Sequence, residues 1–199
     1  TILCVDGATS THQGHYFSRN ASNKLGVSLA KDATPTSGLS VSAATTVTDN
    51  VWHHFAFTKK DRTVRVFLDG VLDATLYLTE DLEPPASTHA AYVGCYYNST
   101  LFFSGYLQDL RWSQTCKYTA TFTPPQIPLG YFKGYATSLM QFEGSNNGTA
   151  FLDDSFNAIT ANGSAVTSTD DFKFGTSSAY FPTTSDYLTV SYGLSNFNW

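Results

Sequence analysis

Apolar and polar residues alternate along much of this 199-residue chain, and Gly, Pro, Asn and Asp interrupt the alternation about every ten residues. An alternation with a period of two places successive side chains on opposite faces of a strand, whereas an amphipathic helix needs apolar residues three and four positions apart. That helical spacing is rare here. The pattern therefore predicts an all-β chain whose antiparallel strands bury their apolar sides by stacking as two sheets.

The clearest hairpin runs from Trp52 to Thr75. Its parts are a strand WHHFAFT (52–58), a turn KKDR (59–62), a return strand VRVFL (64–68) and an Asp69-Gly70 turn into a third strand over 71–77. The return strand places its aliphatic residues on one face and Arg65 and Phe67 on the other. The same pattern predicts one long strand over 101–112, short strands over 172–174, 178–181 and 187–191, and an exposed edge strand or loop over 34–48.

Composition excludes several classes of protein. A net charge of −5 with 11 Lys and Arg leaves no basic surface for nucleic acid. No run approaches the roughly 20 apolar residues that cross a bilayer. The odd count of Cys4, Cys95 and Cys116 cannot form a closed disulfide framework, so we expect buried thiols, with a Cys95–Cys116 bridge as the alternative in an oxidising compartment.

Several phrases carry a family resemblance. They are FAFTKKDRTVRVFLDGVL, GYLQDLRW and FTPP within residues 51–125, and LMQFEGSNNGTAFLDDS, KFGTSSAYF and SDYLTVS within 138–191. This set resembles the laminin-G-like, concanavalin-type jelly roll that is repeated in phage and viral fibre proteins and in extracellular adhesins. The resemblance implies a two-sheet antiparallel sandwich. It also implies a circularly reordered chain, because in that family the LMQFEG-type segment opens the domain and the FTPP-type segment closes it.

This order divides the chain into three predicted parts. Residues 1–125 would be the later strands of the sandwich, 126–137 a connector, and 138–199 the opening strands of the same sandwich or of the next repeat. The stretch from Asn196 to Trp199, followed by the stretch from Thr1 to Val5, resembles one central strand of the family. The chain could be a permutant, a subunit that completes its neighbour, or one period of a tandem array. A cut inside a strand disfavours the first, so we expect adjacent copies to meet through these two stretches.

The resemblance implies a non-catalytic adhesion module of an extracellular or virion-surface fibre that binds a glycan or a receptor. Tyr96, Tyr97 and Asn98 are the candidate ligand-binding residues, since aromatic faces stack on sugar rings and amides hydrogen-bond to hydroxyls. Tyr is also common on ordinary strand faces. A free lectin or a glycoside hydrolase of the same fold is the alternative. Hydrolysis is disfavoured, because the dense acidic run at 79–83 lies in a predicted loop without the spacing of a catalytic carboxylate pair.

Relatives of this fold often hold a structural Ca²⁺. The positions that match are Glu143, the loop 144–147, Asp153 and the Gln108-Asp109 pair. Ca²⁺ takes six to eight oxygen ligands, so carboxylates and loop carbonyls would suit it. Gln108 stands where relatives commonly carry an Asp, and Glu143 replaces a shorter Asp. The resemblance therefore implies a possible but weakened calcium site at Asp109, Glu143 and Asp153.

Overall fold

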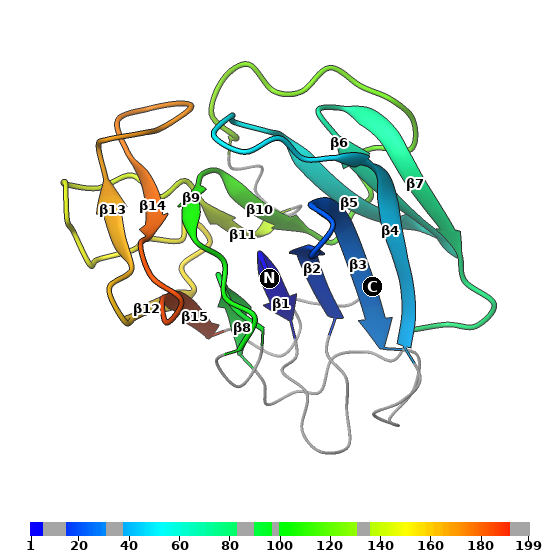
Figure 1. Ribbon diagram of the computed structural model, residues 1–199, viewed down its shortest axis with the longest axis horizontal. Helices are drawn as coiled ribbons and strands as arrows, with labels where there is room; N and C mark the ends of the chain where they lie inside the picture. The colour runs from blue at the N-terminus through cyan, green and yellow to red at the C-terminus, as the bar shows by residue number, and fades with distance from the viewer. Residues whose placement is uncertain (6–14, 31–37, 83–89, 97–99, 131–135, 192–199) are drawn as a thin grey trace.

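The computed structural model describes residues 1–5, 15–30, 38–82, 90–96, 100–130 and 136–191, and every regular element among them is a strand (Figure 1). All strand pairs are antiparallel. In these parts of the chain no helix is long and apolar enough to span a membrane. The predicted all-β class is confirmed.

One layer is a seven-stranded sheet. Its strands, in spatial order, are β12 (Ala158–Asn162), β15 (Tyr187–Ser191), β8 (Ala91–Val93), β1 (Leu3–Val5), β2 (His15–Arg19), β3 (Lys24–Ala30) and β4 (Gly38–Thr46). Strands from distant parts of the sequence are therefore neighbours, since β8 lies between β15 and β1. At one edge β4 approaches the other layer, where the backbone N–H of Thr45 donates to the Asp73 carboxylate at 3.0 Å.

The second layer consists of three smaller groups of strands. They are β5 (Phe55–Lys60), β6 (Thr63–Leu68) and β7 (Val71–Tyr77); β10 (Leu110–Ser113) with β11 (Ala136–Met140); and β13 (Val166–Ser168), β14 (Ser178–Phe181) and β9 (Gly105–Leu107). One apolar core joins the layers, with Phe17, Val66 and Leu188 among its buried members. Burying such a side chain contributes about 1.5–3 kcal/mol. The concanavalin-like two-layer sandwich is therefore confirmed.

Three local predictions are wrong. The strand expected over 101–112 divides at Gln108-Asp109, where Asp109 adopts a left-handed φ of 53°, so β9 and β10 join different sheet groups. Residues 172–174 form no strand, because the backbone N–H of Phe174 donates to the Gln108 side chain at 2.9 Å. The hairpin begins at Phe55 rather than Trp52.

The strands β12 and β13 were not predicted, since they are short runs of Ala, Thr, Ser and Asn with little apolar alternation.

The hairpin is covered on both faces. Val64 and Val66 enter the core, while Phe67, at 0% exposure, lies on the opposite face beneath the rings of Tyr118 and Phe122, with ring centroids 6.3 and 5.4 Å away. We call residues 116–122 the strap. Its ends are tied by hydrogen bonds from the Thr58 hydroxyl to the Tyr118 carbonyl at 2.8 Å and from the Phe122 N–H to the Gly70 carbonyl at 2.9 Å.

The imidazole of His54 is packed between the hairpin and the strap, with its ring edge-on to Phe122 at 5.5 Å. Burial lowers the pKa of His54, the Asp69 carboxylate opposes this, and Lys117 and Arg111 lower it further. The buried Nδ1 has no hydrogen-bond partner, so a proton there would be poorly compensated. The folded state therefore favours the neutral ring.

We expect acid to destabilise the protein through this residue. The unfolded His takes up a proton near pH 6.5, above the pKa of the folded state, so stability is lost as the pH falls through that value. Urea unfolding at pH 7 and pH 5 should show a smaller decrease in His54→Gln than in the wild type. An equal decrease in both proteins would contradict this account.

Candidate functional site

The outer face of the seven-stranded sheet, which points away from the core, carries aromatic and hydroxyl side chains. Strand pairing places six residues in one row across this face: Thr160, Thr189, Tyr92, Cys4, Tyr16 and Ser28. Their sequence neighbours Leu3, Phe17 and Leu188 point into the core. This division follows from the period of two in a strand. The row therefore brings together residues from strands that are far apart in the sequence, and Cys4 is its fully buried member.

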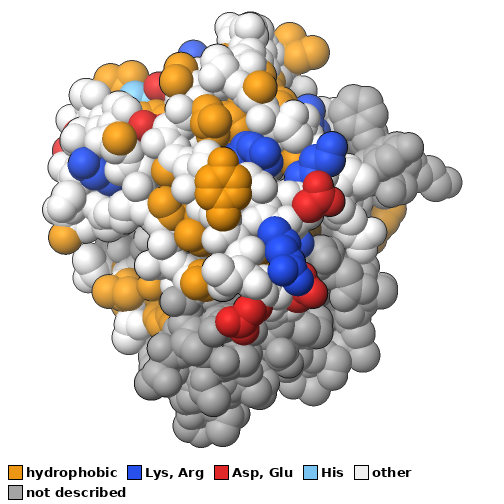
Figure 2. Space-filling view, turned by 90° about the vertical axis from the view of Figure 1, so that its right-hand side faces the viewer, with side chains coloured by type: hydrophobic (Ala, Val, Ile, Leu, Met, Phe, Trp, Pro, Cys, Tyr) orange, Lys and Arg blue, Asp and Glu red, His pale blue; other side chains and the backbone are white. Residues whose placement is uncertain are grey.

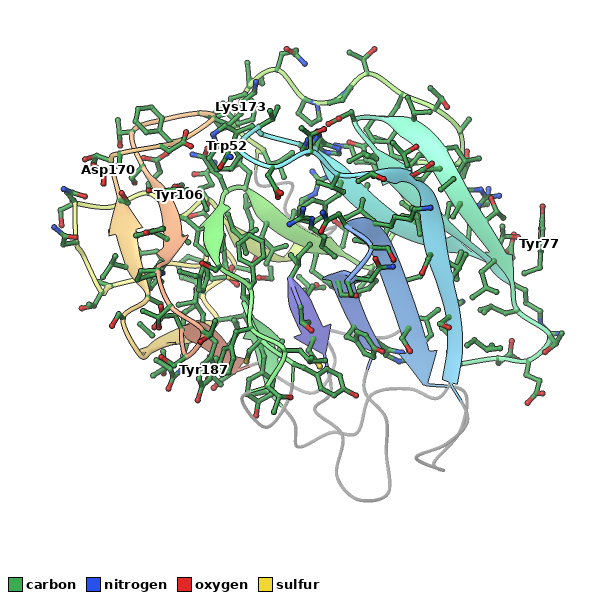
Figure 3. All side chains as sticks on the ribbon, in the orientation of Figure 1. Trp52, Tyr77, Tyr106, Asp170, Lys173 and Tyr187 are labelled. Carbon is green, nitrogen blue, oxygen red and sulfur yellow. The ribbon has the colours of Figure 1, made fainter. Side chains whose placement is uncertain are left out.

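Tyr92, Tyr187 and Phe102 form an aromatic cluster at one side of this row. The ring centroids of Tyr92 and Tyr187 lie 6.2 Å apart, and those of Phe102 and Tyr187 lie 6.3 Å apart. All three side chains are partly exposed. Phe103, the next residue, points the other way and contacts Phe181 in the core at 6.1 Å. Figure 3 shows Tyr187 beside β15 and β8.

The predicted ligand-binding residues are only partly placed. Tyr96 packs edge-on against Tyr16, with ring centroids 4.8 Å apart, and its backbone N–H donates to the Thr100 carbonyl at 2.7 Å. Tyr97 and Asn98 lie outside the described residues. Tyr16 belongs to the same row as Tyr92, so Tyr96 lies next to a member of the outer face. The prediction thus identified one aromatic residue near this face and missed the cluster itself.

The sequence contained a signal for the cluster. Tyr92 and Tyr187 each stand beside buried residues of their strands, as expected for a residue on the outer face. A search for contiguous aromatic residues does not find them, because they become neighbours only through strand pairing. Aromatic residues at outward positions of several strands would have been the better signal.

Polar groups adjoin the aromatic cluster. The Asn162 amide donates to the Thr189 hydroxyl at 3.0 Å and to the Thr160 carbonyl at 3.1 Å. Burial raises the pKa of Tyr92, and the neighbouring Cys95, Tyr187 and Cys4 raise it further. The phenol therefore stays protonated at neutral pH and can both donate and accept a hydrogen bond. Such a surface can offer ring faces and hydrogen bonds to a polar ligand.

Asp153 has a structural role. Its carboxylate is 6% exposed and accepts hydrogen bonds from the Ser138 hydroxyl, the Leu139 and Ser155 backbone N–H groups and the Asn157 amide, at 2.5 to 3.1 Å. These bonds join β11 to the following turn. Both oxygen atoms are used, so a metal ion would have to displace existing donors.

Gln108 and Glu143 close the loop 173–177. The Gln108 amide donates to the carbonyls of Phe174 and Ser177 at 2.6 and 2.8 Å, and its oxygen accepts from the backbone of Lys173 and Phe174. The Glu143 carboxylate accepts from the Thr176 backbone and hydroxyl. An amide donor thus faces carbonyl oxygens, whereas Ca²⁺ needs oxygens that face inward from all sides.

Asp109 has a different environment. One of its oxygens accepts from the Leu129 N–H at 3.1 Å, and burial raises the pKa of its carboxyl group, with a smaller contribution from the Glu143 charge. No group of three or more His, Cys, Asp or Glu within the described parts of the chain is arranged to hold a metal. Asp109, Glu143 and Asp153 therefore do not fit the predicted calcium site as a set.

Cys95 and Cys116 are thiols that are not joined to each other. Cys4 and Cys95 are buried, and the Cys116 thiol donates to the Tyr118 carbonyl at 3.3 Å. Burial raises the pKa of Cys95 to about 12, so this group is an unreactive thiol. The alternative Cys95–Cys116 bridge is not formed.

These features define a two-layer antiparallel β-sandwich with an aromatic cluster on the outer side of its larger sheet. A laminin G type family model, described as the concanavalin A-like lectin/glucanases superfamily, matches residues 2–121. The chain belongs to this superfamily, as the sequence phrases indicated. No curated protein and no solved structure shows significant similarity to it.

Proposed function

We propose that this protein is a non-catalytic binding and assembly module of an extracellular or virion-surface fibre, and that it binds a glycan through the outer face of the seven-stranded sheet. The aromatic cluster of Tyr92, Tyr187 and Phe102 is the observation that carries this proposal. Single exposed apolar residues are common on any protein, whereas three rings from distant segments form a contiguous surface. Their faces suit the apolar faces of sugar rings, and Thr189 and Asn162 supply adjacent polar groups.

The absence of catalysis is part of the proposal. A glycosidase needs two carboxylates that face the scissile bond from opposite sides. Asp109, Glu143 and Asp153 are instead engaged in hydrogen bonds with the backbone or with neighbouring side chains. Release of reducing sugar by the purified protein would favour the hydrolase alternative.

Assembly is supported by the edge strand β12. Within the described residues β12 pairs with β15 on one side, and its sequence AITAN has no charge and no Pro. Edge strands of this kind can accept a strand from another chain. Contact between copies through residues 1–5 and 196–199 also stays in the proposal, although the second stretch lies outside the described residues. Sedimentation velocity would distinguish a self-associating module from a free monomeric lectin.

We expect Tyr187→Ala to weaken glycan binding about tenfold, because loss of one aromatic contact removes about 1.4 kcal/mol. A glycan array would identify a bound oligosaccharide, and titration calorimetry would compare the variants. Tyr77→Ala is the matched control. Tyr77 is 74% exposed on β7, at the opposite end of the molecule (Figure 3), where Figure 2 shows apolar side chains among Lys and Arg. Equal affinities for Tyr187→Ala and wild type would contradict the proposed site.

A further inference from the structure

The strands of the seven-stranded sheet carry very few charges. Within the described residues of these seven strands, the charged side chains are Arg19 and Lys24. Both lie at strand ends. The guanidinium of Arg19 already pairs with Asp49 at 2.6 Å. The outer-face row, with Thr160, Thr189, Tyr92 and Tyr16 among its members, is uncharged.

Distance separates the two cations from the aromatic cluster. β2 and β3 lie three and four strands from β15, which corresponds to about 14 and 19 Å at the usual strand spacing. The Debye length at physiological ionic strength is about 8 Å. Arg19 and Lys24 therefore contribute little attraction to an anion held near Tyr187.

The local environment of Tyr92 agrees with this reading. Apart from burial, the groups that raise its pKa are the thiols of Cys95 and Cys4 and the phenol of Tyr187. None of these is a Lys, Arg, His, Asp or Glu side chain. A sulfate or carboxylate placed here would lose water without gaining a Lys or Arg side chain from the described strands of this sheet, and such poorly compensated burial is costly. Neutral hydroxyl and acetamido groups instead match the Thr189 hydroxyl, the Asn162 amide and the tyrosine phenols.

We infer that the ligand of this face is a neutral glycan, built of hexoses or N-acetylhexosamines without sulfate, sialic acid or uronic acid. The inference rests on the proposed glycan-binding function and names the substrate class of the same face. Recognition then depends on ring stacking and neutral hydrogen bonds. It follows that binding is nearly independent of salt, because no ion pair is formed with the ligand.

The first experiment uses the wild-type protein. Neutral N-acetyllactosamine and β-glucan oligosaccharides are compared on an array with sulfated and sialylated forms of N-acetyllactosamine. We expect the neutral forms to bind more tightly, and the Kd of the best one to change less than about twofold between about 50 and about 500 mM NaCl. Tighter binding of a charged form, or affinity that falls steeply with salt, overturns the inference alone. A failure of every glycan to bind overturns the proposed function together with it.

A charge-swap pair gives a second, independent test. Thr189 lies opposite Tyr92 in the sheet, so Thr189→Lys and Thr189→Glu place opposite charges beside the cluster and lose the same contact with Asn162. A neutral ligand should lose affinity by the same factor in both variants. If Thr189→Lys binds the ligand more tightly than the wild type and Thr189→Glu binds it more weakly, or the reverse, the ligand is charged. Thermal melts of the two variants verify that both are folded before binding is compared.

Discussion

Gly70→Val destabilises the protein by about 2.5–5 kcal/mol and releases the strap from the hairpin. Gly70 has a φ of +80°, and a Cβ atom there would lie 2.0 Å from the Phe122 carbonyl oxygen. A non-glycine residue in the left-handed region costs about 1–2 kcal/mol. The clash also separates Phe122 from Phe67, whose lost burial adds about 1.5–3 kcal/mol.

Urea unfolding would measure this loss of stability. The matched control is Gly130→Val, because a Cβ atom at Gly130 would meet no atom within 4 Å and its φ is not in the left-handed region. The control should change the free energy of unfolding by no more than about 0.5 kcal/mol. Similar losses in the two variants would mean that the contact between Gly70 and the strap is not what holds this side of the hairpin.

Asp153→Ala costs about 3–4 kcal/mol, because it leaves several buried donors without an acceptor. The Ser138 hydroxyl is fully buried, and the Leu139 N–H and the Asn157 amide also bind this carboxylate. Each unsatisfied buried group costs about 1–3 kcal/mol. The thermal midpoint should fall by about 10 °C for a chain of this length.

The neighbouring residue provides the control for Asp153. Asp154 is exposed, and its backbone N–H, which the substitution leaves in place, donates to the Leu139 carbonyl, so Asp154→Ala should shift the midpoint by little. A comparable shift in both variants would indicate a general effect of charge on the turn. A large shift for Asp153→Ala alone would show that the Asp153 carboxylate stabilises the fold.

Local pattern predicted much of the sandwich. The strand over 71–77, the Asp69-Gly70 turn, and the strands over 178–181 and 187–191 agree with β7, β14 and β15. Alternation and turn chemistry act over a few residues, so they can be read along the chain. The break at Gln108-Asp109 could not, because it depends on hydrogen bonds from Gln108 to residues more than 60 positions away.

The candidate site shows the same limit. Tyr96 was predicted from its sequence neighbours, and it does lie beside the outer face. The calcium set stays a prediction, and sequence could not show the surroundings of its carboxylates: the donors around Asp153 come from both β11 and the following turn. A sequence motif shows neither the hydrogen-bond donors that occupy a carboxylate nor the other residues that would share a metal with it.

The sequence by itself determined which residues face inward and which face outward on most strands, because side-chain alternation is a property of each strand alone. The tertiary structure decided which strands are neighbours. Pairing of β15 with β8, almost 100 residues apart, brings Tyr187 to Tyr92, and the chain after β8 adds Phe102. These contacts arise from long-range hydrogen bonds and a shared core. The aromatic, uncharged face is therefore a product of strand order, which local sequence does not encode.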